Sequence, residues 1–417
     1  MRERWEQKKL GEVCSLINRG VAPKYVEAGG IAVLNQKCVR DHHIVFELGR
    51  RHDVGAKRVA PDRFIRVGDV LINSTGVGTL GRVAQVRVEP PEPTTVDTHV
   101  TIVRPEPERF YSDFFGYMLI LIEDEIAKSG AGASGQTELA RATLRNNFTV
   151  SFPASLPEQQ RIVTILDEAF AGLATASAIA AKNLKNAREL VSSYVGSAFA
   201  QRNADWREVQ LGAIAEFKNG LNFTKSSKGE TVRIVGVRDF QNKFWVPTQD
   251  LDSVQIDGGL SEAYELREGD VLTVRSNGNK QLIGRCMVAK EVIERTSHSG
   301  FTIRIRVTTP QVDPVYLTHF LKTREVRKAL VESGDGAQIS NLNQQALNAL
   351  KVAFPPVDQQ LEIVDRISAV EAEASHLEEQ YQAKINQLSA LKQSILQKAF
   401  AGELTLPPSS AIKEAAE

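Results

Sequence analysis

Residues 190–200 read Leu-Val-Ser-Ser-Tyr-Val-Gly-Ser-Ala-Phe-Ala, and residues 391–401 read Leu-Lys-Gln-Ser-Ile-Leu-Gln-Lys-Ala-Phe-Ala. The two stretches share a Leu, a Ser and the final Ala-Phe-Ala in register, at an offset of 201 residues. A second pair keeps this offset, because Arg-x-Gly-Asp-Val-Leu occurs at 66–71 and again at 267–272. Such a repeat predicts two copies of one structural unit related by an internal pseudo-twofold axis.

The length and composition predict a soluble protein with two globular domains. A chain of 417 residues is too long for one ordinary core, and 42% hydrophobic and 24% charged residues are typical of globular proteins. Cys14, Cys38 and Cys286 are too few and too scattered for a disulfide framework or a zinc site. The first residues lack the apolar stretch of a signal peptide, and no apolar run has membrane-spanning length. We therefore expect a cytoplasmic protein without membrane contact.

The formal charge is unevenly distributed, although it sums to zero. Residues 1–152 and residues 203–354 each carry a net charge of +2, whereas residues 355–417 carry −5. The acidic last segment therefore masks two mildly basic parts of the chain. Two basic modules favour DNA binding, although an excess of two positive charges alone is weak evidence for it.

Short apolar runs bounded by Gly, Pro or Asp alternate in both halves, which predicts strands and turns. Strands are expected at 31–34, 70–72 and 100–103, and their counterparts at 234–237, 271–274 and 301–305. Short helices are expected at 111–128 and 314–333, an exposed loop at 89–93, and a closing strand in each half at 149–153 and 351–355. Together these elements indicate an α+β fold.

A long helix is expected after each closing strand. Apolar residues recur there in alternating steps of four and three, from Ile162 to Tyr194 in the first copy and from Ile363 to Ile395 in the second. A seam of this length indicates coiled-coil packing. Each helix either covers its own domain or packs on the other helix. The length and the narrow apolar stripe favour an antiparallel helix pair.

This interpretation divides the chain into five segments. We expect globular domains at 1–152 and 203–354, coiled-coil helices at 153–202 and 355–404, and a flexible tail at 405–417. The expected architecture is α+β, with two globular domains in tandem repeat, separated by two long antiparallel helices with pseudo-twofold symmetry.

The helices and their approaches resemble the conserved regions of type I restriction-modification specificity subunits. The first helix opens with Pro-Glu-Gln-Gln-Arg-Ile-Val at 157–163, and the second ends with Leu-Lys-Gln-Ser-Ile-Leu-Gln-Lys-Ala-Phe-Ala-Gly-Glu-Leu at 391–404. The Gly-rich approaches, at 129–137 and 333–339, resemble the family as well. The ordered set occurs twice, so the resemblance covers essentially the whole chain.

The sequence departs from the family pattern at two places. Gln359 stands where the family has Glu, and the first helix ends in Gln-Arg-Asn at 201–203 rather than in Gly-Glu-Leu. These departures bear on details of the helix interface and leave the order of the segments unchanged.

The resemblance implies a non-catalytic subunit that recognises double-stranded DNA. Each target-recognition domain would read one half of a split site, while the helix pair sets the spacing and docks two methyltransferase (modification) subunits. Two motor-nuclease (restriction) subunits would complete a type I site-specific deoxyribonuclease that is also an adenine-N6 DNA methyltransferase. The resemblance thus places S-adenosylmethionine, ATP and Mg on the partner subunits and no cofactor in this chain.

Two other functions are compatible with the residues alone. The chain could be the targeting subunit of another restriction system, whose partner is a fused nuclease-methyltransferase, or a coiled-coil structural adaptor that never touches DNA. A free-standing DNA-modifying enzyme is disfavoured, because the sequence has no methyltransferase motif, no Walker lysine and no clear nuclease carboxylate-lysine set.

Some residues invite a catalytic or ligand-binding interpretation, and each has a simpler one. The glycine loop at 73–81 follows a strand, but no Gly-Lys-Ser/Thr ends it, so we expect a turn and no nucleotide site. Asp69 and Asp270 each stand in Gly-Asp before an apolar strand, which favours a structural turn. No Cys or carboxylate spacing completes a metal site with the neighbouring histidines His42, His43 and His52.

The candidate DNA contacts lie in loops where the two copies differ between matching strands. Asn, Gln and Arg side chains can hydrogen-bond base edges, and Lys favours phosphate. The candidates after the early strands are Asn35, Gln36, Lys37, Arg40, Arg238, Asp239, Gln241 and Lys243. Those in the glycine loop and its counterpart are Asn73, Ser74, Thr75, Arg275, Asn277, Asn279 and Lys280. A third group, expected to face phosphates, comprises Arg50, Arg51, Lys57, Arg58 and Arg63. No catalytic residue and no metal ligand is expected.

Overall fold

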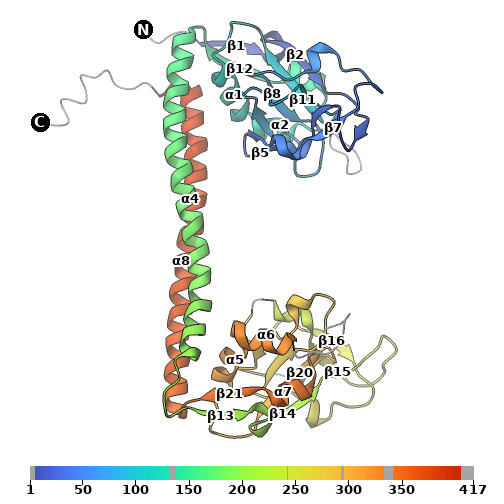
Figure 1. The fold of residues 1–417 in the computed structure, drawn as a ribbon, viewed down its shortest axis with the longest axis vertical. Coiled ribbons are helices and arrows are strands. Elements are labelled where there is room, and N and C mark those ends of the chain that lie inside the picture. Colours follow the sequence, from blue (N-terminus) through green and yellow to red (C-terminus); the bar gives the residue numbers. More distant parts are fainter. Residues whose placement is uncertain (1–4, 131–137, 242, 293–294, 333–340, 405–417) are drawn as a thin grey trace, which may run out of the picture. The chain divides into compact units, whose positions relative to one another are not determined.

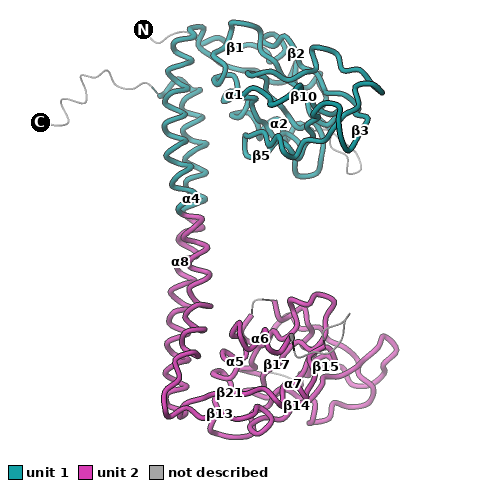
Figure 2. Tube along the Cα trace, in the orientation of Figure 1, with its two compact units in different colours: residues 1–179, 384–417 teal, residues 180–383 magenta. Residues whose placement is uncertain are grey.

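The computed structural model describes residues 5–130, 138–241, 243–292, 295–332 and 341–404. The chain divides into two compact units, one formed by residues 1–179 with 384–417 and the other by residues 180–383 (Figure 2). Each unit combines one globular domain with part of helix α4 (Leu156–Ala200) and part of helix α8 (Val357–Phe400). The α+β class and the repeated organisation expected from the sequence are confirmed. The Gly-rich motifs at 135–137 and 333–339 and the tail at 405–417 lie outside the described residues.

The first domain is built on an antiparallel sheet with the order β2-β11-β8-β9 (Figure 1). Its strands are β2 (Cys14–Arg19), β11 (Val100–Pro105), β8 (Val70–Asn73) and β9 (Val83–Gln85). A second sheet, ordered β10-β4-β7-β3, contains β10 (Thr94–Val96), β4 (Ile31–Leu34), β7 (Arg50–His52) and β3 (Tyr25–Val26). The smaller pairs are β1 (Trp5–Lys9) with β12 (Thr149–Pro153), and β5 (Val39–Arg40) with β6 (His43–Ile44).

The central sheet of this domain is buried on both faces. Val70 and Ile72 of β8 belong to a core that also contains buried residues of α1 (Ser112–Leu121), α2 (Glu123–Lys128) and α3 (Arg141–Asn147). Leu71, between them, belongs to a separate core with residues of the second sheet. Successive side chains of a strand point to opposite faces, so this uninterrupted apolar run serves both cores. Each fully buried side chain of this size stabilises the fold by roughly 1.5–3 kcal/mol.

The second domain repeats the four-stranded central sheet, and its second sheet has three strands where the first domain has four. Its central sheet has the order β14-β20-β17-β18, made of β14 (Ala215–Asn219), β20 (Thr302–Val307), β17 (Val271–Val274) and β18 (Cys286–Val288). The second sheet is β16-β15-β19, with β16 (Asp252–Gln255), β15 (Thr231–Val235) and β19 (Thr296–His298). The closing strand β21 (Lys351–Phe354) pairs with β13 (Arg207–Gln210), and the short helices are α5 (Pro314–Lys322), α6 (Arg324–Glu332) and α7 (Gln344–Ala349).

The two short helices predicted from the sequence are each divided into two helices. The break after α1 falls at Ile122, and the break after α5 falls at Thr323. Thr323 has an extended ψ of 148°, and its hydroxyl donates to the Phe320 carbonyl at 2.8 Å. The apolar pattern continues across each break, which is why the sequence predicted a single helix.

The long helices α4 and α8 pack antiparallel within each unit, as predicted. In the first unit the Arg161 guanidinium donates to the Leu404 carbonyl at 3.3 Å, and Lys392 lies over the Phe170 ring. In the second unit Arg188 Nε lies 2.9 Å from Glu378 Oε2. In these contacts the residue number on α8 decreases as the residue number on α4 increases, so the two helices run in opposite directions.

The sequence was expected to contain no apolar stretch of membrane-spanning length, and helix α4 shows that this expectation was wrong. An 18-residue window of α4 has a mean hydropathy of 1.5 and is only 17% buried, so by length and composition α4 could cross a membrane. Its apolar stripe instead packs on α8: Leu166 shares a core with Leu396, and Phe199 shares one with Ile367. Ala-rich turns raise the hydropathy of the window, and one such helix is weak evidence for a membrane span.

Candidate nucleic-acid interface

In the first domain, the loop after β4 and the glycine loop after β8 lie against each other. Gln36 Nε2 donates to the Thr75 carbonyl at 3.2 Å, and Asn73 Nδ2 donates to the Gln36 carbonyl at 3.1 Å. Asn35 caps the short helical turn Gln36–Cys38 by accepting from the Lys37 amide at 2.8 Å. Two of the three predicted groups of DNA contacts therefore form one surface, where Lys37 and Arg40 are exposed.

The glycine loop itself carries an exposed apolar residue that the sequence analysis missed. Val77 is 87% exposed between Gly76 and Gly78, both of which have positive φ. His99 joins the same surface, because its Nδ1 lies 2.7 Å from Thr75 Oγ1. The loop then returns directly to β9 without a helix, so it has no phosphate-cradle architecture.

Three of the predicted contacts are buried and hydrogen-bonded inside the protein. Asn73 and Ser74 are fully buried, and Ser74 Oγ lies 2.5 Å from Thr101 Oγ1. Asp239 is 8% exposed, and its carboxylate accepts from the Gly236 amide at 2.8 Å. These side chains shape their loops, and the exposed residues beside them are the better candidates for contact with a ligand.

The third predicted group does not form a single patch. Arg51 pairs with Glu92 at 2.5 Å, and the Arg50 guanidinium stacks 3.4 Å from the centre of the Tyr25 ring. Lys57 Nζ donates to the Ala22 carbonyl at 3.1 Å. The two other members are Arg63, which lies 3.5 Å from Asp62, and the exposed Arg58. Most of these cations have partners within the protein.

In the second domain the corresponding candidates are more exposed. Arg238 ends 2.7 Å from Asp252 and remains 58% exposed, and Gln241 and Lys243 follow it on the surface. In the counterpart of the glycine loop, Asn277 Oδ1 accepts from the Asn279 amide at 2.8 Å. The remaining candidates of that loop are the half-buried Arg275 and the exposed Lys280.

Phe301 is a second residue that sequence analysis missed. Its side chain is 63% exposed, and its carbonyl accepts from the Arg275 amide at 2.8 Å. His99 holds the same place in the first domain, because its carbonyl accepts from the Ser74 amide at 2.8 Å. The two residues are 202 apart in the sequence, so a comparison at a strict offset of 201 does not align them. An exposed aromatic side chain beside polar loops is a platform on which a base can stack.

The two Gly-Asp carboxylates are structural, as predicted. Asp69 is 1% exposed, accepts from the Arg66 amide at 2.8 Å and pairs with both Arg104 Nε and Nη2 at 2.7 Å. Asp270 repeats this pattern with Arg306, again at 2.7 Å for both nitrogens. A buried carboxylate held by a bidentate guanidinium fixes the turn before the central strand.

The three neighbouring histidines are directed to separate partners. His42 lies 2.6 Å from Glu123, His43 bonds the Asp41 carbonyl, and the buried His52 accepts from the Lys24 amide at 2.9 Å. Over the described residues, no group of three His, Cys, Asp or Glu side chains is placed to hold a metal ion. The exposed side chains of the divergent loops are mainly polar or cationic, the residue types that contact nucleic acid.

Comparison with known proteins adds an independent line of evidence. A family model described as "Type I restriction modification DNA specificity domain" matches residues 2–182 and 203–387. The specificity subunit of the type I restriction enzyme StySPI from Salmonella potsdam is 30% identical over 202 residues. That match covers 48% of this chain and 43% of the relative, so the chain spans less than half of the relative's length.

Solved structures resemble the fold over nearly the whole chain. A chain from a study of complex assembly and conformational transition in a type I restriction-modification system has a TM-score of 0.74 at 19% identity, covering 96% of this chain and 98% of that one. The HsdS subunit of Thermoanaerobacter tengcongensis has a TM-score of 0.57 at 20% identity, covering 96% and 97% of the two chains. At these identities the likeness establishes the fold alone.

Proposed function

The chain belongs to the family of type I restriction-modification DNA specificity subunits, and on that premise we propose that each of its two globular domains reads one half of a split DNA site. The role is recognition, and the chemistry is carried out elsewhere in the complex. Residues 1–152 would read one half-site and residues 203–354 the other, with the helical segments 153–202 and 355–404 between them.

The distribution of differences between the two copies is the observation that carries this proposal. The Gly-Asp turns and the central strands match, down to the bidentate Asp69–Arg104 and Asp270–Arg306 pairs. The loops at the ends of those strands differ in residue type and in length. A shared scaffold with divergent polar loops is what two readers of different short sequences require.

Within each domain we assign base contacts to loop side chains that are exposed or half-buried. In the first domain these are Gln36 and Thr75, with Val77 and His99 beside them. In the second they are Arg275, Asn277, Asn279 and Gln241, with Phe301 as a stacking or wedge residue. Phosphate contacts fall to the remaining exposed cations of these loops, which are Lys37, Arg40, Arg238, Lys243 and Lys280.

We assign the spacing of the half-sites and the docking of partners to α4 and α8. A continuous helix of 45 residues at about 1.5 Å per residue is a semi-rigid element, so its length can define a gap measured in base pairs. Exposed apolar side chains on the helices, including Ile179, Leu190 and Leu391, together with Lys182 and Lys185, offer a surface for two modification subunits. S-adenosylmethionine, ATP and Mg would be bound by the modification and restriction subunits of a cytoplasmic complex.

Mapping of DNA methylation tests this function directly. Cells that lack the system would be given the modification subunit with this chain, and adenine methylation would be mapped across the genome. The expected result is methylation at one split motif with a fixed gap, and none when this chain is omitted. Methylation at an uninterrupted motif, or methylation that persists without this chain, would refute the proposal. An adaptor that never touches DNA predicts a motif set by another subunit.

A further inference from the structure

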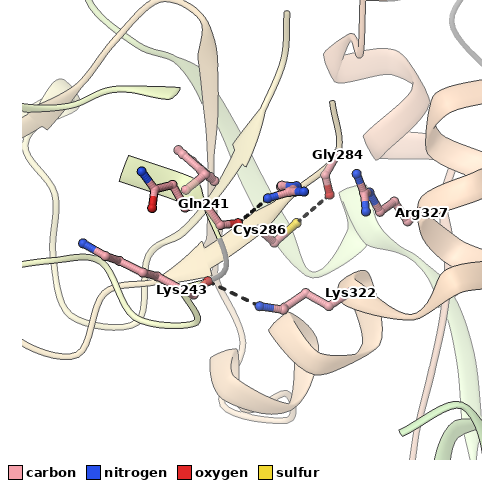
Figure 3. Close-up of a pocket in the computed structure, with 8 residues that line it drawn as sticks. Gln241, Lys243, Gly284, Cys286, Lys322 and Arg327 are labelled. Carbon is pink, nitrogen blue, oxygen red and sulfur yellow. Dashed lines mark hydrogen bonds between the residues drawn. The ribbon is translucent and has the colours of Figure 1, made fainter. Parts of the chain in front are cut away.

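The second domain contains a cavity of about 210 Å³ beside the first residue of β18. This volume is several times the roughly 30 Å³ that one water occupies in the liquid. Figure 3 shows Lys322 and Arg327 reaching from the helices toward the strand segment that carries Gly284 and Cys286. Gln241 and Lys243, two of the predicted DNA contacts, line the opposite side.

Positive charge dominates the lining of this cavity. Lys322 Nζ donates to the Lys243 carbonyl at 3.4 Å, and Arg327 Nε donates to the Ile283 carbonyl at 3.5 Å. Arg285 Nη1 donates to the Gln241 carbonyl. The acceptors of Lys322 and Arg327 in these contacts are neutral carbonyl oxygens, which do not neutralise the charge of either side chain.

No internal carboxylate compensates Lys322 or Arg327 at short range. Among the described residues, neither side chain has an Asp or Glu oxygen within 4.0 Å, and Glu371 acts on Lys322 only from further away. Burial raises the pKa of the Cys286 thiol, so that group is neutral. Burial is also the main cause that lowers the pKa of Lys322, and the charges of Arg285 and Arg327 act in the same direction. Lys322 and Arg327, two like charges in a partly buried site without a short-range carboxylate among the described residues, favour an external anion.

In the first domain, a carboxylate of the chain itself occupies the corresponding position. Val83 is the counterpart of Cys286 in the sheet. Val83 pairs with Ile72, Cys286 pairs with Thr273, and Thr273 follows Ile72 by 201 residues. There Glu123 accepts from the Val83 amide at 2.8 Å and pairs with His42 at 2.6 Å. The first domain thus holds a negative group at the start of this strand, and the second domain holds cations around a cavity.

We infer that the cavity of the second domain binds a phosphate group, which takes the place that the Glu123 carboxylate fills in the first domain. Arg and Lys donors form strong charge-assisted hydrogen bonds with phosphate oxygens. A phosphodiester of the bound duplex is the source favoured by the lining, because Gln241 and Lys243 belong to the loop assigned to DNA. That source rests on the proposed function, whereas the phosphate site itself does not. A free phosphate or a nucleotide is the other source of the same chemistry.

Inorganic phosphate is the first probe, applied to the full chain at constant ionic strength with chloride as the reference. Phosphate at about ten times its Kd is expected to raise the Tm by about 3 °C through binding to the folded state. The variants K322Q and R327Q should each weaken phosphate binding by about tenfold, because each removes a charge-assisted hydrogen bond. K225Q, which removes an exposed lysine elsewhere in the same unit, is the matched control and should bind as the parent does.

A third variant tests the comparison between the domains by adding a carboxylate to the cavity. R327E supplies an internal carboxylate, so it should abolish the phosphate effect while folding at least as well as R327Q in phosphate-free buffer. The site is disproved if phosphate has no effect on the parent chain, or if its effect persists in both K322Q and R327Q.

Duplex DNA separates the two sources of phosphate. If the ligand is a backbone phosphate, R327Q should weaken binding of every duplex alike and reduce the slope of log affinity against log salt by about one. If phosphate binding is lost while DNA binding is unchanged, the ligand is a free phosphate or nucleotide. Failure of the parent complex to methylate a split motif would contradict the proposed function and leave the phosphate result standing.

Discussion

At the residue scale, two buried glutamines explain why the helix-start motif is repeated. Gln159 accepts from the Tyr111 amide at 2.8 Å and donates to the Pro153 carbonyl at 2.9 Å. Gln360 repeats this with the Asp313 amide at 2.9 Å and the Pro355 carbonyl at 2.8 Å. Each carboxamide therefore joins a long helix to the closing strand and to the segment before the short helices. The departure at Gln359 leaves this junction intact, because the neighbouring Gln360 makes the contacts.

Replacing the buried glutamine should destabilise the first domain strongly. The variant Q159M keeps the length of the side chain and leaves the Tyr111 amide and the Pro153 carbonyl without partners. Each unsatisfied buried group costs about 1–3 kcal/mol, so we expect the free energy of unfolding to fall by about 3 kcal/mol. Urea denaturation measures this. The adjacent and exposed Gln160 gives the control Q160M, which should change stability by no more than about 0.5 kcal/mol.

His298 predicts a pH dependence that belongs to the second domain. Its ring is buried, Nδ1 lies 2.9 Å from Thr302 Oγ1, and Nε2 has no hydrogen-bond partner among the described residues. Burial lowers the pKa of His298 from 6.5 to about 3, and the nearby Arg304 lowers it as well. The unfolded state therefore binds more protons between these values, and stability is full above about pH 6.5 and falls as the pH decreases toward 3.

The variant H298V should remove this part of the pH dependence. Val96 occupies the equivalent strand position of the first domain, so the side chain fits the same fold. Relative to pH 7.5, the parent should lose about 2 kcal/mol at pH 5 through His298, and the variant should lose none of that share. His319, whose pKa burial lowers to about 4, titrates in the same window and leaves a residual slope. Denaturant titrations at several pH values measure this. If the free energy of unfolding fell equally with decreasing pH in parent and variant, His298 would not be the group responsible.

At the element scale, most strands and the long helices were predictable and the loops were not. The strand predicted at 234–237 instead spans Thr231–Val235, because a short helical turn begins at Val237. The strand at 271–274 and the strand at 149–153 have the predicted bounds, because a run of apolar residues between turn residues has few alternatives. The short helices were predicted as single helices, because Ile122 and Thr323 interrupt them without a Gly or Pro. Backbone breaks of this kind are set by tertiary packing, which periodicity does not record.

The helix pair makes a prediction about the gap between half-sites. The division of the two units falls between residues 179 and 180 in α4 and between 383 and 384 in α8. A matched insertion of about one helical turn at both points therefore leaves the contacts inside each unit unchanged. We expect methylation mapping to show a longer gap and the same two half-sites. Insertion into α4 alone is the control, because it places the α4–α8 contacts of the units out of register. An unchanged gap after the matched insertion would mean that the helices do not set the spacing.

At the scale of the whole molecule, the domains should be exchangeable as modules. Replacing residues 1–152 with the same region of a relative should change one half of the methylated motif and preserve the other, since each domain has its own sheets and cores. The incoming domain must supply an aromatic residue at the position of Phe114, whose ring centre lies 4.9 Å from that of Phe400. A motif altered in both halves would contradict independent reading by the domains.

The candidate interface shows what sequence comparison can locate and what it cannot. Comparing the two copies located the divergent loops, and the structure places Gln36 and Thr75 of those loops in contact. The comparison did not separate exposed from buried loop residues, so Asn73 and Ser74 were included although they are fully buried. It missed Phe301, whose position depends on a one-residue shift between the copies. The cation cluster at Lys322 also escaped notice, because its members come from segments far apart in the chain.

The discontinuous first unit has a consequence for the order of events during synthesis. Leu396, Ala399 and Phe400 complete the core that begins at Trp5, whereas the second unit is made from one continuous segment. A ribosome therefore delivers every residue of the second unit before the last residues of the first core. Until then the earliest-made domain keeps an aromatic face around Trp5 and Phe114 uncovered, which is a surface that chaperones bind and that nascent chains aggregate through. The part of the protein that is translated first is the part that finishes folding last.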